Sequence, residues 1–108
     1  GERVELSAFQ QKVSNLTATW TDPKEPANTE AIVMLLTEEF GELVRAIRKT
    51  RGGRSGHPGE GVGSSEDVAA ELGDVLFLLA RLALVSGVEM ETAAATVIEK
   101  INRRSQKE

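Results

Sequence analysis

From Glu71 the chain reads Glu71-Leu-Gly-Asp-Val-Leu-Phe-Leu-Leu-Ala-Arg-Leu-Ala-Leu-Val85, and from Val75 onward this segment is apolar on every side of a helix except at Arg81. A helix that is apolar all round must be covered all round. The chain has 108 residues, the size of one small domain. A small helical domain can scarcely cover such a helix by itself. We therefore expect a second copy to cover the remainder, in a homodimer or a tetramer.

Capping and helix-breaking residues set the limits of the helices on either side of this one. Ser64 followed by Asp67 predicts a capping box at the start of the apolar helix, and Gly87 predicts its end. Thr29 is the expected N-cap of the preceding helix, which follows a stretch containing two prolines. The predicted helices cover about residues 2–16, 29–49, 64–86 and 90–104.

The segment 51–65 contains six glycines and almost nothing to bury, which predicts a flexible loop. It has no preceding strand and no Gly-x-x-x-x-Gly-Lys pattern, so it is not a phosphate-binding P-loop. No part of the sequence shows a strand pattern. The fold class that follows is all-α, with a four-helix bundle-like protomer and one domain over residues 1–108.

Composition excludes several classes of function. Thirteen Lys and Arg against 17 Asp and Glu leave a net charge of −4, so no basic field favours nucleic acid or an anionic membrane surface. The absence of cysteine excludes disulfides, zinc ribbons and thiol catalysis. The most apolar run, 75–85, is too short to span a bilayer. We expect a soluble, cytoplasmic protein with no nucleic-acid or membrane partner.

Two pairs of acidic residues fall on helix faces that are otherwise apolar. At about 100° per residue, Glu39 lies inside the apolar sector of its helix and Glu42 lies at the edge of that sector. Glu71 and Asp74 repeat the i, i+3 spacing on the apolar helix that follows. The sector around Glu39 comprises Ile32, Val33, Leu35, Leu36, Phe40, Leu43 and Ile47.

Carboxylates in such positions require compensation. Burying one unpaired carboxylate costs several kcal/mol, and like charges about 6 Å apart repel by on the order of 2–3 kcal/mol. Protonation, a protein cation or a metal ion could compensate, but Arg45, Arg48 and Arg81 project away from the acids on the helical wheel. Oxygen ligands without His or Cys favour Mg²⁺, with Mn²⁺ as a substitute. The alternative is that the pairs simply face solvent.

The segment Leu36-Thr-Glu-Glu-Phe-Gly-Glu-Leu43, followed later by Glu71-Leu-Gly-Asp-Val-Leu-Phe-Leu-Leu79, resembles the MazG type of all-α nucleoside triphosphate pyrophosphohydrolases. The signature of that family is Glu-Glu-x-x-Glu, a variable gap and then Glu-x-x-Asp. Lys100-Ile-Asn-Arg-Arg104 resembles the family's Lys-x-x-Arg-Arg in the last helix. The resemblance covers about residues 29–104.

This resemblance implies Mg²⁺-dependent hydrolysis of nucleoside triphosphates to the monophosphate and pyrophosphate. Its implied metal ligands are Glu39, Glu42, Glu71 and Asp74. Glu38 is an auxiliary acid, which we expect to act with Glu39 in orienting the attacking water. Lys100, Arg103 and Arg104 are the implied phosphate contacts, although the helix dipole favours basic residues there in any case. Trp20 either stacks on the base or forms a lid on the core.

Two other functions remain open from the sequence. The chain could be a relative with a narrower substrate, such as a dUTP or a phosphoribosyl-ATP pyrophosphohydrolase. It could also be a non-enzymatic helical module whose acidic pairs bind a basic partner or a structural ion. The sequence does not fix the preferred base or sugar.

Overall fold

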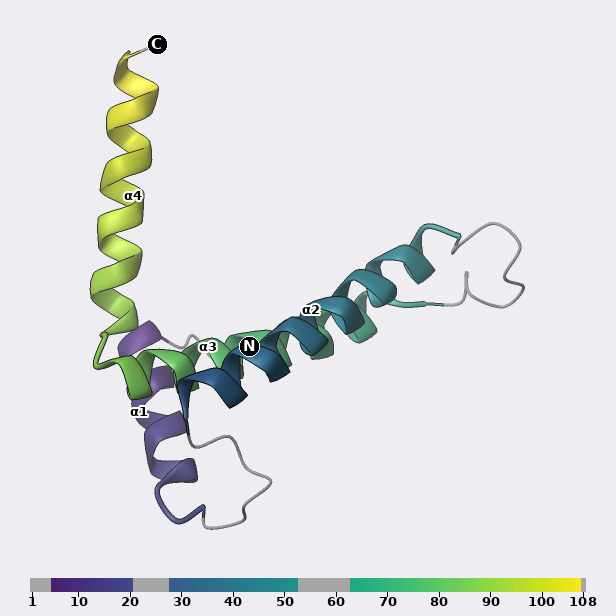
Figure 1. Ribbon diagram of the computed structural model, residues 1–108. Helices are drawn as coiled ribbons and strands as arrows, with labels where there is room; N and C mark the ends of the chain where they lie inside the picture. Colours follow the sequence, from purple (N-terminus) through teal and green to yellow (C-terminus); the bar gives the residue numbers. More distant parts are fainter. Residues whose placement is uncertain (1–4, 21–27, 53–62, 108) are drawn as a thin grey trace.

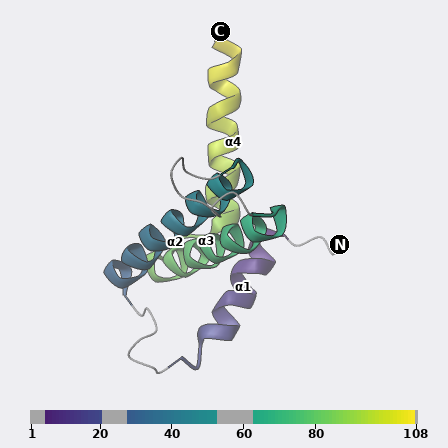
Figure 2. The same ribbon diagram turned by 90° about the vertical axis from the view of Figure 1, so that its right-hand side faces the viewer.

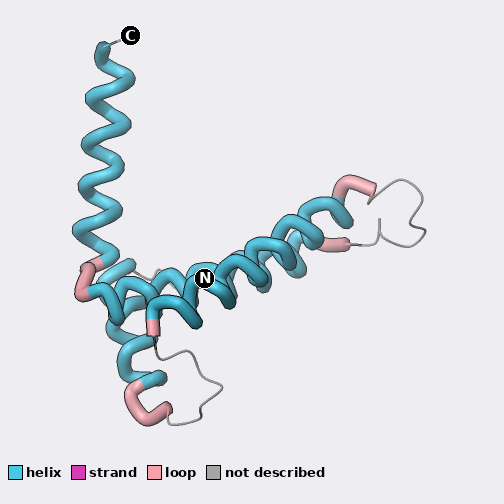
Figure 3. The backbone as a smooth tube through the Cα atoms, in the orientation of Figure 1, coloured by secondary structure: helices cyan, strands magenta, loops and turns pink. Residues whose placement is uncertain are grey.

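The computed structural model describes residues 5–20, 28–52 and 63–107, and within these ranges every regular element is a helix (Figures 1 and 3). The four helices confirm the predicted all-α fold. Residues 53–62 of the predicted glycine loop lie outside the described ranges. The helices are α1 (Leu6–Thr17), α2 (Thr29–Thr50), α3 (Ser65–Ser86) and α4 (Met90–Lys107).

The helix ends agree with the sequence in α3 and differ slightly elsewhere. Ser64 and Asp67 make both bonds of the predicted capping box, and Gly87 ends α3 in the left-handed conformation with φ 67°. The N-cap of α2 is Asn28 and not Thr29, because the Asn28 side chain accepts a hydrogen bond of 2.9 Å from the Ala31 amide. The fourth helix continues past Arg104 to its end at Lys107.

Helices α2 and α3 lie side by side as an antiparallel hairpin (Figures 1 and 2). Just before α3, Gly63 passes close to the end of α2, since a Cβ on Gly63 would lie 2.7 Å from the Lys49 Cβ. Glycine is therefore required at this approach. The buried residues of the hairpin are Ile32, Leu43 and Ala46 from α2, with Val75, Leu78 and Ala80 from α3.

Helix α1 covers a second side of α3 and contacts Arg81, the one basic residue of that helix. The Arg81 Nη1 atom donates a hydrogen bond of 2.9 Å to Thr17 Oγ1, which itself donates to the Val13 carbonyl. The guanidinium carbon of Arg81 lies 5.3 Å from the centroid of the Trp20 ring, and this ring lies 5.8 Å from that of Phe77. Thus the end of α1 and Trp20 after it provide polar and aromatic contacts for the Arg81 guanidinium.

A third side of α3 has no cover in the described chain. Leu72, Leu76 and Leu79 follow one another at helical spacing, and each is more than a third exposed. Helix α4 does not cover them, because it turns away from the hairpin (Figure 1). The radius of gyration is 17.0 Å, against about 13 Å for a compact domain of this length. The described part of one copy thus leaves α3 incompletely covered, as its composition predicts.

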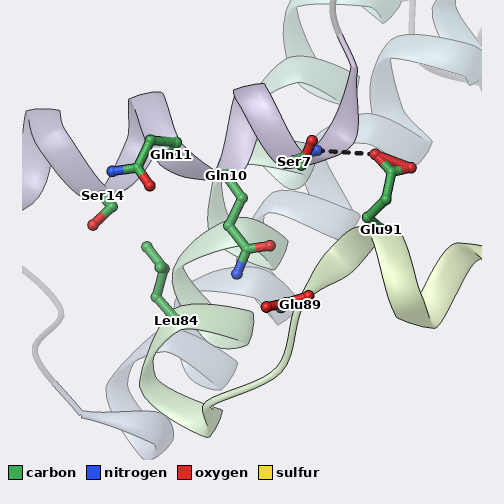
Figure 4. Close-up of a pocket in the computed structure, with 7 residues that line it drawn as sticks. All are labelled: Ser7, Gln10, Gln11, Ser14, Leu84, Glu89 and Glu91. Carbon is green, nitrogen blue, oxygen red and sulfur yellow. Dashed lines mark hydrogen bonds between the residues drawn. The ribbon is translucent and has the colours of Figure 1, made fainter.

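The N-termini of α1 and α4 cap each other. The Gln10 side chain of α1 donates to the Val88 carbonyl and accepts from the Met90 amide at the start of α4, both at 2.8 Å. In return, the Glu91 carboxylate of α4 accepts from the Ser7 amide at 3.2 Å (Figure 4). Amides in the first turn of a helix have no partner within the helix. These side chains therefore satisfy both helix ends and hold α4 at its angle to α1.

No helix in the described ranges is both long enough and apolar enough to cross a membrane.

Replacing Gln10 with Ala should loosen the junction between α1 and α4. Two hydrogen bonds are lost and the first amide of α4 is left without a partner, so we expect a loss of about 1–2 kcal/mol in the free energy of unfolding. Chemical denaturation followed by circular dichroism measures this change. Gln11→Ala is the matched control, because the Gln11 amide bonds only Asn15 on the same helix in the described structure. Equal losses in the two variants would contradict the capping role.

Candidate metal centre

Three carboxylates from two helices meet beside the hairpin core. Glu39 comes from α2, whereas Glu71 and Asp74 come from α3, one turn apart. One oxygen of each lies within 4.8 Å of the others. The antiparallel packing of α2 and α3 brings together acids that are 32 or more residues apart in the sequence. Of the two predicted acidic pairs, Glu71 and Asp74 both belong to the cluster, whereas only Glu39 of the other pair does.

The position of Glu39 follows from the buried stripe of α2. Ile32, Leu43 and Ala46 are buried, and Glu39 lies on the same face at helical spacing and is half-buried. The predicted apolar sector is too wide, because Val33 and Phe40 at its far side are 43% and 50% exposed. Their helix contacts α3 through only part of that sector.

The neighbouring carboxylates disfavour the charged form of Glu39. Desolvation raises the pKa of Glu39 above its ordinary value, and the charges of Asp74, Glu71 and Glu42 raise it further. A hydrogen bond with the Glu71 side chain acts in the same direction. The charged groups that act on Glu39 in this way are all carboxylates. The cluster thus brings like charges together around Glu39.

The remaining acids of the first motif lie at the margin of this cluster. Glu42 is exposed and is not among the three clustered carboxylates, although its charge reaches Glu39. Glu38 is also exposed and outside the cluster. Both residues thus border the three clustered carboxylates without belonging to them.

The expected phosphate contacts are not brought to the carboxylates within one chain. Lys100, Arg103 and Arg104 lie on the outer half of α4, which leads away from the hairpin (Figure 1). Arg103 instead forms an exposed ion pair of 2.7 Å with Glu99. The Trp20 ring contacts Phe77 and Arg81, which fits a lid on the core.

The donor set suits a hard divalent cation. All three clustered groups are carboxylates, the ligand type of Mg²⁺ and Mn²⁺, and neither His nor Cys is among them. A cation bound between them would relieve the repulsion that raises the Glu39 pKa. The residues present therefore fit such an ion.

The chain is similar in sequence to known proteins. Over 74 residues the chain is 35% identical to the uncharacterized protein YpjD of Bacillus subtilis (strain 168). That match covers 68% of this chain and 64% of the relative, so the chain spans somewhat less than two thirds of that protein. No solved structure matches the chain significantly. The family profile of the MazG nucleotide pyrophosphohydrolase domain matches residues 27–108, a range that includes all three clustered carboxylates. The chain therefore belongs to the MazG nucleotide pyrophosphohydrolase family.

Proposed function

We propose that this protein hydrolyses nucleoside triphosphates, ribo- or deoxy-, to the nucleoside monophosphate and pyrophosphate in an Mg²⁺-dependent reaction. The observation that carries the proposal is the cluster of Glu39, Glu71 and Asp74 inside a MazG domain. A polyphosphate is strongly negative and could not approach such a cluster without cations between the two. Substrate and site are therefore compatible only through a divalent metal.

Glu39, Glu71 and Asp74 hold the metal in this proposal, and Glu42 joins them at the exposed margin. A bound divalent cation supplies Lewis-acid charge, which activates water and neutralises the phosphate oxygens. Glu39 and its neighbour Glu38 orient the attacking water. The oxygen of water bonds to the α-phosphorus, the bond from that phosphorus to the bridging oxygen breaks, and pyrophosphate leaves with the bond electrons while the proton lost by the water passes to solvent. No protein nucleophile is needed.

The substrate contacts come from outside the carboxylate cluster. Lys100, Arg103 and Arg104 bind phosphate oxygens, and Trp20 stacks on the base, which would require it to leave its contact with Arg81. We propose that the active form is a homodimer, or a tetramer of paired dimers. A cytoplasmic location remains a prediction from the cysteine-free sequence.

The repulsion around Glu39 should lower the stability of the metal-free protein at neutral pH, and Mg²⁺ binding should restore that stability. Because folding raises the Glu39 pKa above 4.5, this carboxyl stabilises the metal-free fold at lower pH, and the effect is lost as pH rises through the raised pKa. Replacing Glu39 with Gln should therefore stabilise the metal-free protein at pH 7, by about 0.2–0.5 kcal/mol for each like-charge pair relieved. Mg²⁺ at ten times its Kd should stabilise the wild type by about 1.4 kcal/mol.

Thermal unfolding in EDTA and in Mg²⁺ measures both effects. Glu99→Gln is the control, because this carboxylate lies on α4 and pairs with Arg103. It should keep the full response to Mg²⁺, whereas Glu39→Gln should lose most of it. An equal response in the two variants would place the metal elsewhere.

A panel of ribo- and deoxynucleoside triphosphates, assayed for pyrophosphate release with Mg²⁺, tests the activity. Glu39→Gln and Asp74→Asn should each lower kcat by about 100-fold or more, since each removes metal-bound charge worth several kcal/mol in the transition state. Circular dichroism should show unchanged helix content. Turnover of a single nucleotide would indicate a narrow-substrate relative. No turnover with any member would favour the helical binding module.

Hydrolysis in ¹⁸O-labelled water tests the position of attack. Attack at the α-phosphorus forms its new bond there, so the label should appear in the monophosphate. Mass spectrometry of the two products gives the answer directly. Label in the pyrophosphate would refute the proposed step.

A further inference from the structure

One line of side chains on α3 leads away from the carboxylate cluster. Asp74, Phe77 and Arg81 follow one another at i, i+3 and i+7. At about 100° per residue, Asp74 and Arg81 point within about 20° of the same direction. Trp20, just after α1, contacts both Phe77 and Arg81. The line therefore connects the candidate metal centre with an aromatic ring and a guanidinium group.

The residues along this line are accessible to a ligand. Asp74 is exposed, Phe77 and Arg81 are half-buried, and Trp20 is 37% exposed. Seven residues of helix separate Asp74 from Arg81 by about 10.5 Å. This length accommodates a metal ion, one phosphate and a sugar. A nucleotide with its phosphates at Asp74 and its sugar over Phe77 thus has its base beside Arg81 and Trp20.

The guanidinium group of Arg81 is held in place by α1. Its Nη1 atom donates a hydrogen bond of 2.9 Å to Thr17 Oγ1. That hydroxyl is buried and donates in turn to the Val13 carbonyl at 2.9 Å. A guanidinium is planar and weakly hydrated, so its face stacks readily on flat rings. A plane that is already fixed also loses less conformational entropy when a ligand binds to it.

The distance between Trp20 and Arg81 is close to what a base requires. The guanidinium carbon lies 5.3 Å from the centroid of the Trp20 ring. A base stacked on both faces needs two contacts of about 3.5 Å, or about 7 Å in all. The ring therefore has to move outward by only about 2 Å. Trp20 follows the C-cap of α1 at Ala18, so this movement breaks no helical turn.

We propose that the base of the nucleotide binds between the Trp20 indole and the Arg81 guanidinium, which makes Arg81 a second stacking surface for the base. The inference rests on the proposed function and adds to it the residue of α3 that recognises the base. Every base has a flat π face, so a site of this kind accepts purines and pyrimidines alike. It discriminates instead between a nucleotide and a polyphosphate that carries no base.

The fluorescence of Trp20 and calorimetry test the proposal together. Trp20 is the one tryptophan of the sequence, which contains no tyrosine, so the emission of the protein reports this ring. The first probe is adenosine triphosphate with a methylene group in place of the α,β-bridging oxygen, which the proposed reaction does not cleave. The second is inorganic tripolyphosphate, and both are added with Mg²⁺. The nucleotide should quench the fluorescence, whereas tripolyphosphate should leave it nearly unchanged.

Arg81→Lys separates stacking from charge, because lysine keeps the positive charge and a donor for Thr17 but has no plane. It should raise the Kd of the nucleotide by about tenfold, as expected for one stacking contact. The Kd of tripolyphosphate should remain within about twofold of the wild type, since the charge is kept. Arg51→Lys is the matched control, because Arg51 is exposed at the far end of α2, and it should change neither Kd. If Arg81→Lys lowers the helix content, Arg81→Met keeps the apolar contact with Trp20 and provides the same comparison.

The possible outcomes decide between three roles of Arg81. Equal losses of affinity for the nucleotide and for tripolyphosphate would make it a phosphate contact and overturn the base site. Unchanged affinity for both would show that its contact with Trp20 serves only the fold, which also overturns the site. A wild type that binds the nucleotide as expected but releases pyrophosphate from no nucleotide refutes the proposed function and leaves the base site standing. A wild type that binds neither probe overturns both.

Discussion

The packing of α2 against α3 determines the rest of the structure. The register that buries Ile32 and Leu43 against Val75 and Leu78 also holds Glu39 beside Glu71 and Asp74. The hydrophobic contact is therefore the force that brings like charges together. Burial of apolar side chains worth about 1.5–3 kcal/mol each supplies enough free energy to hold a few repelling carboxylates in place. The carboxylates stay together because the buried apolar contacts between α2 and α3 hold the two helices in place.

Helix α3 belongs to several surfaces at once. Its sides contact α2 through Val75 and Leu78, and the end of α1 through Phe77 and Arg81. Its third side, with Leu72, Leu76 and Leu79, remains open in one copy. The Arg81 guanidinium donates a hydrogen bond to Thr17 and lies over the Trp20 ring, on the side of α3 away from this open face. Arg81, the one charged residue of α3 after Asp74, thus lies on the side that faces α1.

Local signals in the sequence predict a large part of this arrangement. The capping box at Ser64 and the stop at Gly87 were predictable because their bonds join residues within a few positions. The acidic pairs were predictable because a carboxylate on an apolar helix face is costly to bury without a compensating charge. The direction of α4 was not predictable, since Gln10 and Glu91 act on residues about 80 positions away and look like ordinary surface residues. The exposure of Phe40 was missed because a helical wheel shows an apolar sector but not how much of it one neighbour can cover.

The mutual capping of α1 and α4 also bears on how the chain is made. The hairpin of α2 and α3 joins neighbouring segments and can form before α4 is available. The Ser7 amide, by contrast, has to wait for Glu91, and the Met90 amide needs a residue translated 80 positions earlier. During synthesis α1 therefore emerges without the protein partner of its Ser7 amide, which becomes available only when α4 has been made.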